Sequence, residues 1–367
     1  MLLGVFFYKR QAKKSQQVAV VGATGESKNS PPKPDSMIKS SDRVAPLVPF
    51  GELSPKKNVA MLYLKPHANT AAAQLAVRSF LERRGMRIVK EAGVDANAMH
   101  YNAYKFEKQY SVIAKRAVHS EPAEISLTAA SFVRFQKKFG LSWAVAVSQN
   151  RVKNAASACE YLEMDIATFT RVWIKCMQKN LYLQFGRGLC VGYIDSVEGK
   201  DAIFVINGFF FGMRSEYQCA DSQLHCFSVE FDADAIPWSV FRSNILGSSD
   251  PLKAHPDSLR RHLASLAKSL ELRHEPSTLH NCIHGSSSAF EAIAEHALWF
   301  GSPITSIPFA NRLLSSGIPA TVIKEWLDNP IVKGRRVYDH MESLGCDDCE
   351  IKARELYSVA EGNDTCI

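Results

Sequence analysis

The sequence lacks any long hydrophobic run, and no stretch approaches the ~18 consecutive apolar residues that a membrane-spanning helix requires. It also lacks a concentrated basic stripe with interleaved aromatic residues, which is the usual sequence signal for nucleic acid binding. The net charge of +7 is spread over 367 residues, and basic residues gather only in short clusters. We therefore expect neither a membrane protein nor a nucleic acid-binding protein.

The cysteines do not form the pattern of a disulfide framework or of a zinc finger. Nine of them, an odd number, are scattered from Cys159 to Cys366, which favours reduced thiols in a reducing compartment. Cys346 and Cys349 form a lone C-x-x-C pair without two further ligands at suitable spacing. We expect a cytoplasmic location. The alternative is a mitochondrial one, because residues 1–25 contain several basic residues and no acidic residue.

The composition, 46% hydrophobic and 22% charged, is typical of a globular protein with a sizeable core. Residues 1–55 are expected to be a disordered tail or linker, because prolines interrupt a Lys- and Ser-rich segment without hydrophobic periodicity. Residues 56–302 are expected to form the main domain, interrupted by a mostly helical insertion at about 120–200. Residues 303–367 are expected to be a helical extension divided by prolines.

Apolar runs and capping residues predict the elements of the main domain. Strands are expected at 58–64, 86–92, 181–185, 189–194, 202–206 and 224–231, and helices at 71–84, 96–118, 126–140, 166–179, from 257, and up to 300. Thr70 or Asn69 can cap the helix that Gly85 ends.

The most informative segment is 281–288, which reads N-C-I-H-G-S-S-S and precedes a helix. The amides at a helix N-terminus favour phosphate, and the neutral imidazole of His284 is a nucleophile near physiological pH. Glu295 follows eleven residues later, about three helical turns, and could bond the other ring nitrogen. Alone, a histidine at such a position is more often a cap or a hydrogen-bonded polar group.

This segment resembles the active-site signature of nucleoside diphosphate kinases, Asn-x-x-His-Gly-Ser before a helix that carries a glutamate. Further pieces follow in the family's order: VAMLYLKP at 59–66, Tyr110, FFFGMRSEY at 209–217, and LGSSDPLKAHPDSLR at 246–260. The resemblance covers roughly residues 58–118 and 200–302. It implies an α+β fold, a ferredoxin-like βαββαβ antiparallel sheet with flanking helices.

The resemblance also implies a phosphotransferase that moves the γ-phosphate of a nucleoside triphosphate to a diphosphate through a phosphohistidine at His284. Glu295 would orient that histidine, and Lys65 would contact phosphate. The nucleotide-binding residues would be Lys65, Tyr110, Phe209 or Phe210, Arg242, Ser249, Arg260 and Asn281. The implied partners are nucleoside tri- and diphosphates with Mg²⁺, and a homo-oligomer is a further expectation.

The chain departs from the family's pattern at several residues. His67 and Ala68 follow Lys65-Pro66 where the family has Asp-Gly, and Ser287 replaces the aspartate of His-Gly-Ser-Asp. A second phosphate-binding arginine is expected at position 243, which is Ser243, and Arg242 could substitute only if the backbone shifts.

The spacing departs as well. Extra residues separate Arg260 from Asn281, and a long insertion separates Tyr110 from Phe209. Loops tolerate such insertions, but these could cover the nucleotide cleft. The alternative of a catalytically inactive, nucleotide-binding or scaffolding protein on the same fold therefore stays open.

Overall fold

The computed structural model describes residues 57–95, 103–186, 188–195, 197 and 199–362. The expected tail or linker at residues 1–55 lies outside these ranges, and so does the start of the helix expected at 96–118. Within the described ranges, no helix has the length and apolar character needed to cross a membrane. The eight described cysteines are all free thiols.

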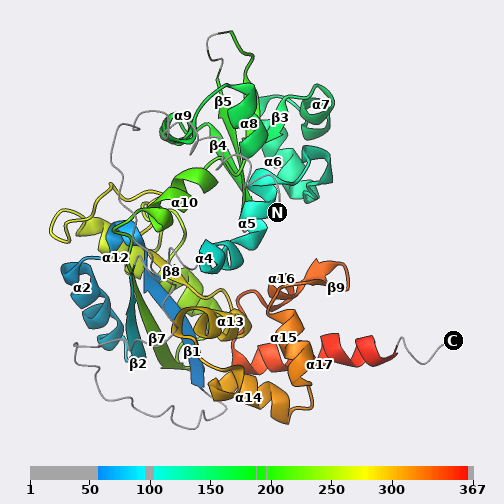
Figure 1. The fold of residues 1–367 in the computed structure, drawn as a ribbon. Coiled ribbons are helices and arrows are strands. Elements are labelled where there is room, and N and C mark those ends of the chain that lie inside the picture. The colour runs from blue at the N-terminus through cyan, green and yellow to red at the C-terminus, as the bar shows by residue number, and fades with distance from the viewer. Residues whose placement is uncertain (1–56, 96–102, 187, 196, 198, 363–367) are drawn as a thin grey trace, which may run out of the picture. The chain divides into compact units, whose positions relative to one another are not determined.

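The fold is a mixed α+β arrangement around a four-stranded main sheet with the order β2-β7-β1-β8 (Figure 1). Its strands are β1 (Lys57–Leu64), β2 (Arg87–Val94), β7 (Leu224–Asp232) and β8 (Ile283–Gly285). Each pair of neighbouring strands is antiparallel. The strands expected at 58–64, 86–92 and 224–231 are thereby confirmed to within two residues.

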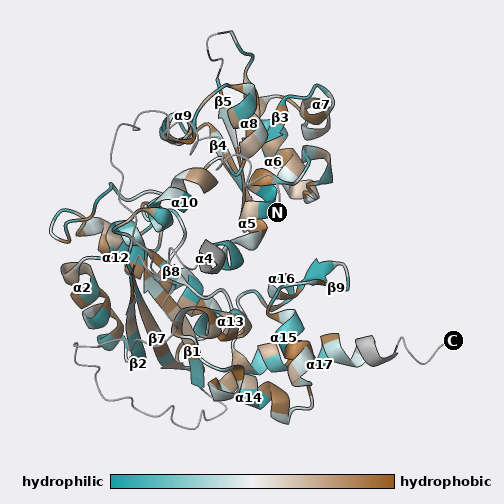
Figure 2. Ribbon diagram, viewed as in Figure 1, coloured by the Kyte–Doolittle hydropathy of each residue, from teal (hydrophilic) through white to brown (hydrophobic). Residues whose placement is uncertain are grey.

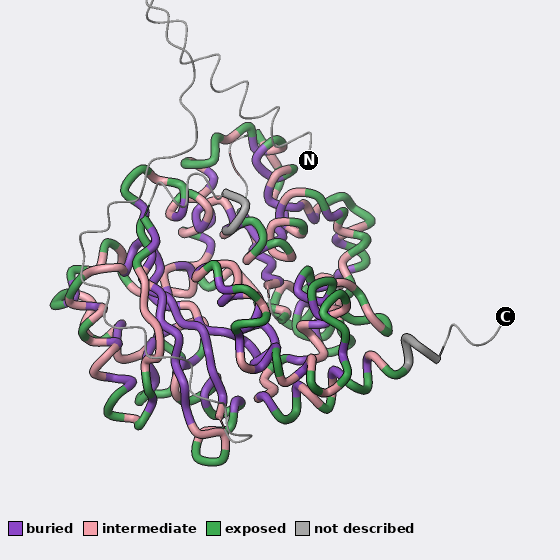
Figure 3. Tube along the Cα trace, turned by 60° about the horizontal axis from the view of Figure 1, so that its bottom comes forward, coloured by how far each residue is buried: buried purple, intermediate pink, exposed green. Residues whose placement is uncertain are grey.

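Strand β1 is buried on both faces, which explains its unbroken apolar sequence. Ala60, Leu62 and Leu64 point into one hydrophobic core, and Met61 and Tyr63 point into a second core on the other face. Figure 3 shows the central strands buried and the surrounding loops exposed. The alternation matters for function because Tyr63 points to the face on which the candidate site lies.

The first core is built from helices on one side of the main sheet and from the C-terminal segment. The helices are α2 (Ala71–Glu82), α12 (Leu259–Ser265), α13 (Ala289–Phe300), α14 (Pro308–Ser315), α15 (Ala320–Trp326), α16 (Val337–Met341) and α17 (Cys346–Gly362). Around α14 and α15, hydrophobic and hydrophilic residues occupy different sides (Figure 2). The C-terminal helices bury Phe309, Trp326 and Cys349 in this core, together with a short ribbon of β9 (Ile331–Val332) and β10 (Arg335–Arg336).

The insertion contains a second sheet as well as helices. Helices α4 (Ala103–Gln109) and α5 (Ser111–Val118) precede it. Its own helices are α6 (Ala129–Phe139), α7 (Trp143–Ser148), α8 (Ala155–Tyr161) and α9 (Ile166–Gln178). The sheet has the order β3-β6-β5-β4, with β3 (Val152–Asn154), β4 (Tyr182–Gly186), β5 (Leu189–Ile194) and β6 (Ile203–Ile206). Within 120–200 most of the regular structure is helical, and β4, β5 and β6 lie at the strands expected at 181–185, 189–194 and 202–206. Strand β3 was not predicted, because its three residues are too few to show a period and pair in parallel with the distant β6.

Two short elements connect the insertion and the main sheet to the site. Helix α10 (Phe210–Gln218) follows β6 and leads into β7. After β7, α11 (Trp238–Val240) continues into a π-helix, Phe241–Leu246, which ends at Gly247. Gly247 has a φ of 88°, and a Cβ there would clash with Ser258, so the chain needs glycine at this turn.

Candidate functional site

His284 lies on β8, directly opposite Tyr63 of β1. The two rings stack with centroids 4.6 Å apart and an interplanar angle of 15°. The Nε2 atom of His284 is 2.5 Å from Oε1 of Glu295, which projects from α13 and is 1% exposed. A carboxylate accepts hydrogen bonds, so the imidazole proton sits on Nε2 and the lone pair on Nδ1. No described residue forms a hydrogen bond with that Nδ1 atom.

The carboxylate of Glu295 is held by two further donors. Its Oε1 accepts a bond of 2.8 Å from the Gln109 amide, and its Oε2 accepts one of 2.5 Å from the Ser286 hydroxyl. The indole N–H of Trp299 donates to Oε1 of Gln109 at 3.1 Å. Because an indole can only donate, this contact turns the NH₂ group of Gln109 toward Glu295. The sequence analysis missed Gln109, whose only signal was its place beside Tyr110.

Two guanidinium groups hold the carbonyls on either side of His284. Arg260 donates from Nε and Nη2 to the Ile283 carbonyl at 3.1 and 3.0 Å, and from Nη1 to the Gly247 carbonyl at 2.7 Å. Arg242 donates from Nη1 to the Gly285 carbonyl at 2.9 Å. The positive charge around the imidazole therefore comes from side chains that also fix the backbone of β8.

Lys65 adds a third cation, at the end of β1. Burial and the neighbouring Arg260 lower the pKa of Lys65 to about 7. Burial and Arg242 lower the pKa of Arg260 to about 9, which leaves this guanidinium charged at physiological pH. The described residues supply no hydrogen bond or ion pair to the Lys65 ammonium. Cations that depress one another's pKa in a buried place form a site that an anion would stabilise.

The π-helix explains how Arg242 reaches the site. The N–H of Gly247 bonds to the carbonyl of Arg242 at 3.2 Å, a bond that spans five residues instead of the four of an α-helix. The wider turn accommodates one additional residue, so the guanidinium at position 242 reaches β8. Ser243 is exposed and bonds to the Ser239 carbonyl. The guanidinium at position 242, and not the side chain of Ser243, therefore borders β8.

Asn281 presents an unused acceptor. Its Nδ2 donates to the carbonyls of Ser249 and Thr278 at 3.2 and 3.3 Å. Its Oδ1 is buried and has no partner among the described residues. An unsatisfied buried acceptor is costly, and a ligand hydroxyl would satisfy this one.

The structure decides between the two phenylalanines proposed to contact the base. Phe209 is half-buried and lines the cavity beside His284. Phe210 is 2% exposed and packs in the second core beside Phe106 and Phe211. Of the two residues left open by the sequence, only Phe209 therefore borders the cavity, because consecutive helical residues point about 100° apart.

Tyr110 lies at the site, although its hydroxyl is engaged within the protein. That hydroxyl bonds to Tyr63 at 2.6 Å and to Tyr217 at 3.1 Å, and the ring meets His284 edge-on at 6.4 Å. Burial raises the pKa of Tyr110 to about 12, so the phenol is neutral at physiological pH. The three tyrosines form a packed floor under the imidazole.

One cavity of about 1330 Å³ brings these groups together. Apart from Phe210, every site residue predicted from the sequence lines it: Lys65, Tyr110, Phe209, Arg242, Ser249, Arg260, Asn281, His284 and Glu295. The insertion contributes Gln184 to its wall, and the C-terminal segment contributes Asp328 and Glu342. Both extra segments therefore border the cavity without filling it.

No protein-family model matches this chain, and no curated protein sequence matches it. Among solved structures, the chain is similar to the apo nucleoside diphosphate kinase from Encephalitozoon cuniculi in a cubic crystal form. The identity is 14% and the TM-score 0.33, over 74% of this chain and 99% of that one. We base the function on the geometry around His284 and not on this likeness.

Proposed function

We propose that the chain is a nucleoside diphosphate kinase-type phosphotransferase with His284 as the phosphoryl acceptor. The observation that carries the proposal is the fixed imidazole: Nε2 bonds to Glu295, while Nδ1 has no bonding partner among the described residues. The mixed α+β main sheet supports it, since its strands are antiparallel neighbours in the order β2-β7-β1-β8 and helices pack on it.

The chemistry needs no proton to leave the histidine. The Nδ1 lone pair attacks the γ-phosphorus, the P–N bond forms, and the bond to the bridging oxygen breaks with its electron pair on the departing diphosphate. The phosphorylated ring is positively charged, and the Glu295 carboxylate at 2.5 Å offsets that charge. Attack by the terminal oxygen of a second nucleoside diphosphate reverses the step and restores the imidazole.

The other residues position the nucleotide in this proposal. Lys65, Arg242 and Arg260 face the phosphates, Asn281 accepts from a sugar hydroxyl, and Phe209 stacks on the base. Stacking tolerates any base, because each base has a π-face. In the part of the chain that the structure describes, one trio of side chains could hold a metal ion, and it contains neither His284 nor Glu295. Mg²⁺ would therefore arrive on the nucleotide's phosphates and offset their charge.

A second candidate is a nucleotide-binding or scaffolding protein without phosphoryl transfer. Arg260 favours it, because three of its nitrogen atoms already donate to backbone carbonyls. The acidic Asp328 and Glu342 on the cavity wall favour the scaffolding role alone, since they disfavour an approaching triphosphate.

The test is incubation of the protein with γ-labelled ATP and Mg²⁺, followed by acid or alkali treatment. Label that is acid-labile, alkali-stable, removed by a nucleoside diphosphate and absent from His284→Ala supports phosphoryl transfer. His119→Ala, at an exposed histidine on the C-cap of α5, is the matched control and should label normally. Nucleotide binding without label would leave the second candidate.

A further inference from the structure

Three histidines from segments where this chain departs from the kinase pattern lie close together in the structure. His67 follows Lys65-Pro66, and His274 and His280 lie in the lengthened segment between α12 and β8. That segment is fastened near His67, because the Arg273 N–H bonds to the His67 carbonyl at 3.2 Å. Glu216, on the last turn of α10, faces the same place. The cluster has no part in the phosphoryl transfer proposed above.

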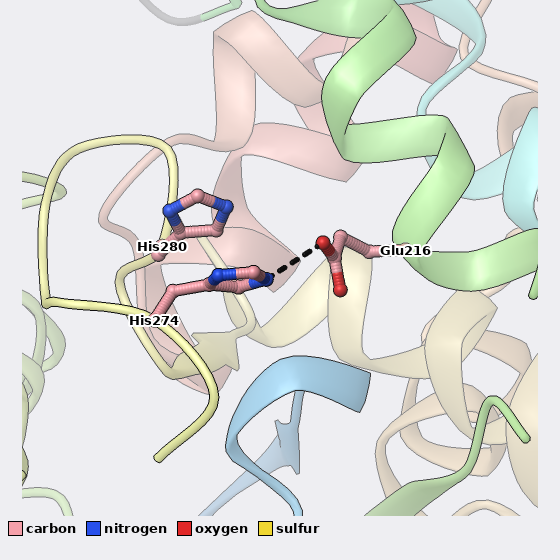
Figure 4. Close-up of side chains that lie close together, drawn as sticks. All are labelled: Glu216, His274 and His280. Carbon is pink, nitrogen blue, oxygen red and sulfur yellow. Dashed lines mark hydrogen bonds and ion pairs between the residues drawn. The ribbon is translucent and has the colours of Figure 1, made fainter. Parts of the chain in front are cut away.

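The side chains of Glu216, His274 and His280 converge (Figure 4). One ligand atom from each lies within 4.8 Å of the other two. Nε2 of His274 is 2.9 Å from Oε1 of Glu216, and the rings of His274 and His280 stack with centroids 4.2 Å apart. The His274 side chain is 39% exposed and that of Glu216 20%, so an ion can reach the trio from solvent.

His67 lies beside this trio and is itself unsatisfied. Its ring meets that of His280 edge-on at 5.1 Å and that of His274 at 6.0 Å. It is 3% exposed, and its Nε2 has no hydrogen-bond partner in the part of the chain that the structure describes. Burial lowers the pKa of His280 to about 4 and holds that of His67 well below its usual range.

We infer that Glu216, His274 and His280 form a binding site for one Zn²⁺ ion. Two imidazoles and one carboxylate suit zinc, whereas Mg²⁺ and Ca²⁺ prefer oxygen ligands alone. Tetrahedral ligands at 2.0–2.1 Å from zinc lie roughly 3.3 Å apart, so the three ligand atoms, now within 4.8 Å of one another, would have to draw together on binding the ion. Water or His67 supplies the fourth ligand.

The ion would join two parts of the cavity wall. Glu216 belongs to α10, whose N-cap is Phe209, and His280 immediately precedes Asn281. A zinc ion bound by both Glu216 and His280 would fix the distance between the Phe209 ring and Oδ1 of Asn281. The role is structural, and it holds whether the cavity transfers phosphate or only binds nucleotides.

The test uses the full chain, stripped with EDTA and titrated with Zn²⁺ against a chromophoric chelator. We expect one ion per chain, and at least tenfold weaker binding in Glu216→Gln, His274→Ala and His280→Ala. His119→Ala, remote from the trio in sequence, and His284→Ala, at the phosphoryl site, should bind as the unaltered chain does. Co²⁺ in place of Zn²⁺ should give the visible absorption of a four-coordinate ion.

Either of two binding results would overturn the inference: absence of stoichiometric binding by the unaltered chain, or equal binding by the trio variants. Thermal unfolding separates ion loss from misfolding. In EDTA the His274→Ala midpoint should match that of the unaltered chain, whereas Zn²⁺ should raise the midpoint of the unaltered chain alone. A Zn²⁺-induced rise of equal size in both would also overturn it.

Discussion

At the scale of single residues, Gln109 decides how firmly the His284–Glu295 pair is held. Its amide donates to Glu295 and is oriented by Trp299. We expect Gln109→Leu to slow phosphohistidine formation about tenfold, because a hydrogen bond to a charged group contributes about 1.5–3 kcal/mol. Nucleotide affinity should change little, since Gln109 acts through Glu295. Single-turnover labelling with γ-labelled ATP measures the rate.

Gln184→Leu is the matched control, because Gln184 lines the same cavity from the insertion. It should label at the rate of the unaltered chain. An unchanged rate in Gln109→Leu, or an equal loss in both variants, would show that the amide does not position Glu295.

If the cavity binds nucleotides as proposed, Lys65 should make their affinity depend on pH. Burial and Arg260 lower its pKa to about 7, so in the free protein the ammonium loses its proton as pH rises through 7. A bound phosphate favours the charged form, so binding at pH 8 must take up a proton. We expect affinity for Mg-ADP to fall with pH above 7, by up to about tenfold per unit.

Calorimetry in buffers of different ionisation enthalpy measures the proton uptake. Lys65→Met should bind more weakly, with an affinity that is flat between pH 7.5 and 8.5. A pH-independent affinity in the unaltered chain would exclude this role for Lys65.

At the scale of elements, helix α13 is joined to β7 by a buried neutral histidine. His296 is 1% exposed, bonds to Ser228 at 2.8 Å through Nε2, and contacts the Ala292 carbonyl at 2.6 Å through Nδ1. Burial lowers its pKa to about 4. Between pH 6.5 and 4, His296 binds a proton in the unfolded chain but stays neutral in the folded chain. Stability should therefore fall as pH falls through this window, by about 3 kcal/mol from His296.

Urea unfolding at several pH values measures this slope. His67 and His280 contribute in the same direction, so the informative quantity is a difference. The dependence of the free energy of unfolding on pH should be weaker in His296→Gln, by the amount that corresponds to about one proton. Equal pH dependence in both proteins would show that His296 is not the group responsible.

Elements with a long run or a clear pattern of apolar residues could be predicted from local sequence. Elements that depend on pairing with a distant strand could not. The unbroken run of β1 and the cap at Thr70 identify β1 and α2 from local sequence alone. Strand β3 is stabilised by pairing with β6, some fifty residues away. Pairing of that kind leaves no local signal, so the second sheet could not be assembled from the sequence.

At the scale of the whole molecule, the C-terminal segment shares the core of the main sheet. The Cys346 N–H bonds to Asn58 Oδ1 of β1 at 2.9 Å, and the Ser343 N–H bonds to the Ser287 carbonyl at 2.8 Å. Trp326 is 4% exposed and meets Phe290 of α13. We expect Trp326→Ala to lower the free energy of unfolding by about 3–5 kcal/mol.

Ile331→Ala is the control from the same segment, because Ile331 is 66% exposed. It should change the free energy of unfolding by less than about 0.5 kcal/mol. Chemical unfolding compares the two, and an equally small effect of Trp326→Ala would show that the segment is not part of the cooperative fold.

The residues of the candidate site could be proposed from the sequence where several motifs in one order carry the resemblance, as for His284, Glu295 and Lys65. They could not be predicted where spatial neighbours decide. Phe209 and Phe210 are chemically identical, and only the start of α10 separates them. His67, His274 and His280 read as unrelated departures in the sequence, and only the fold brings them together.

The π-helix at Phe241–Leu246 has a consequence for how this chain is aligned with others. A comparison partner with an ordinary α-helix there needs a one-residue gap inside the helix, where alignment methods penalise gaps most. Without the gap, an alignment places Ser243 at the position where the resemblance leads us to expect an arginine. Every residue before the π-helix is then shifted by one position. Sequence profiles built for this region should therefore allow a single insertion between positions 241 and 246.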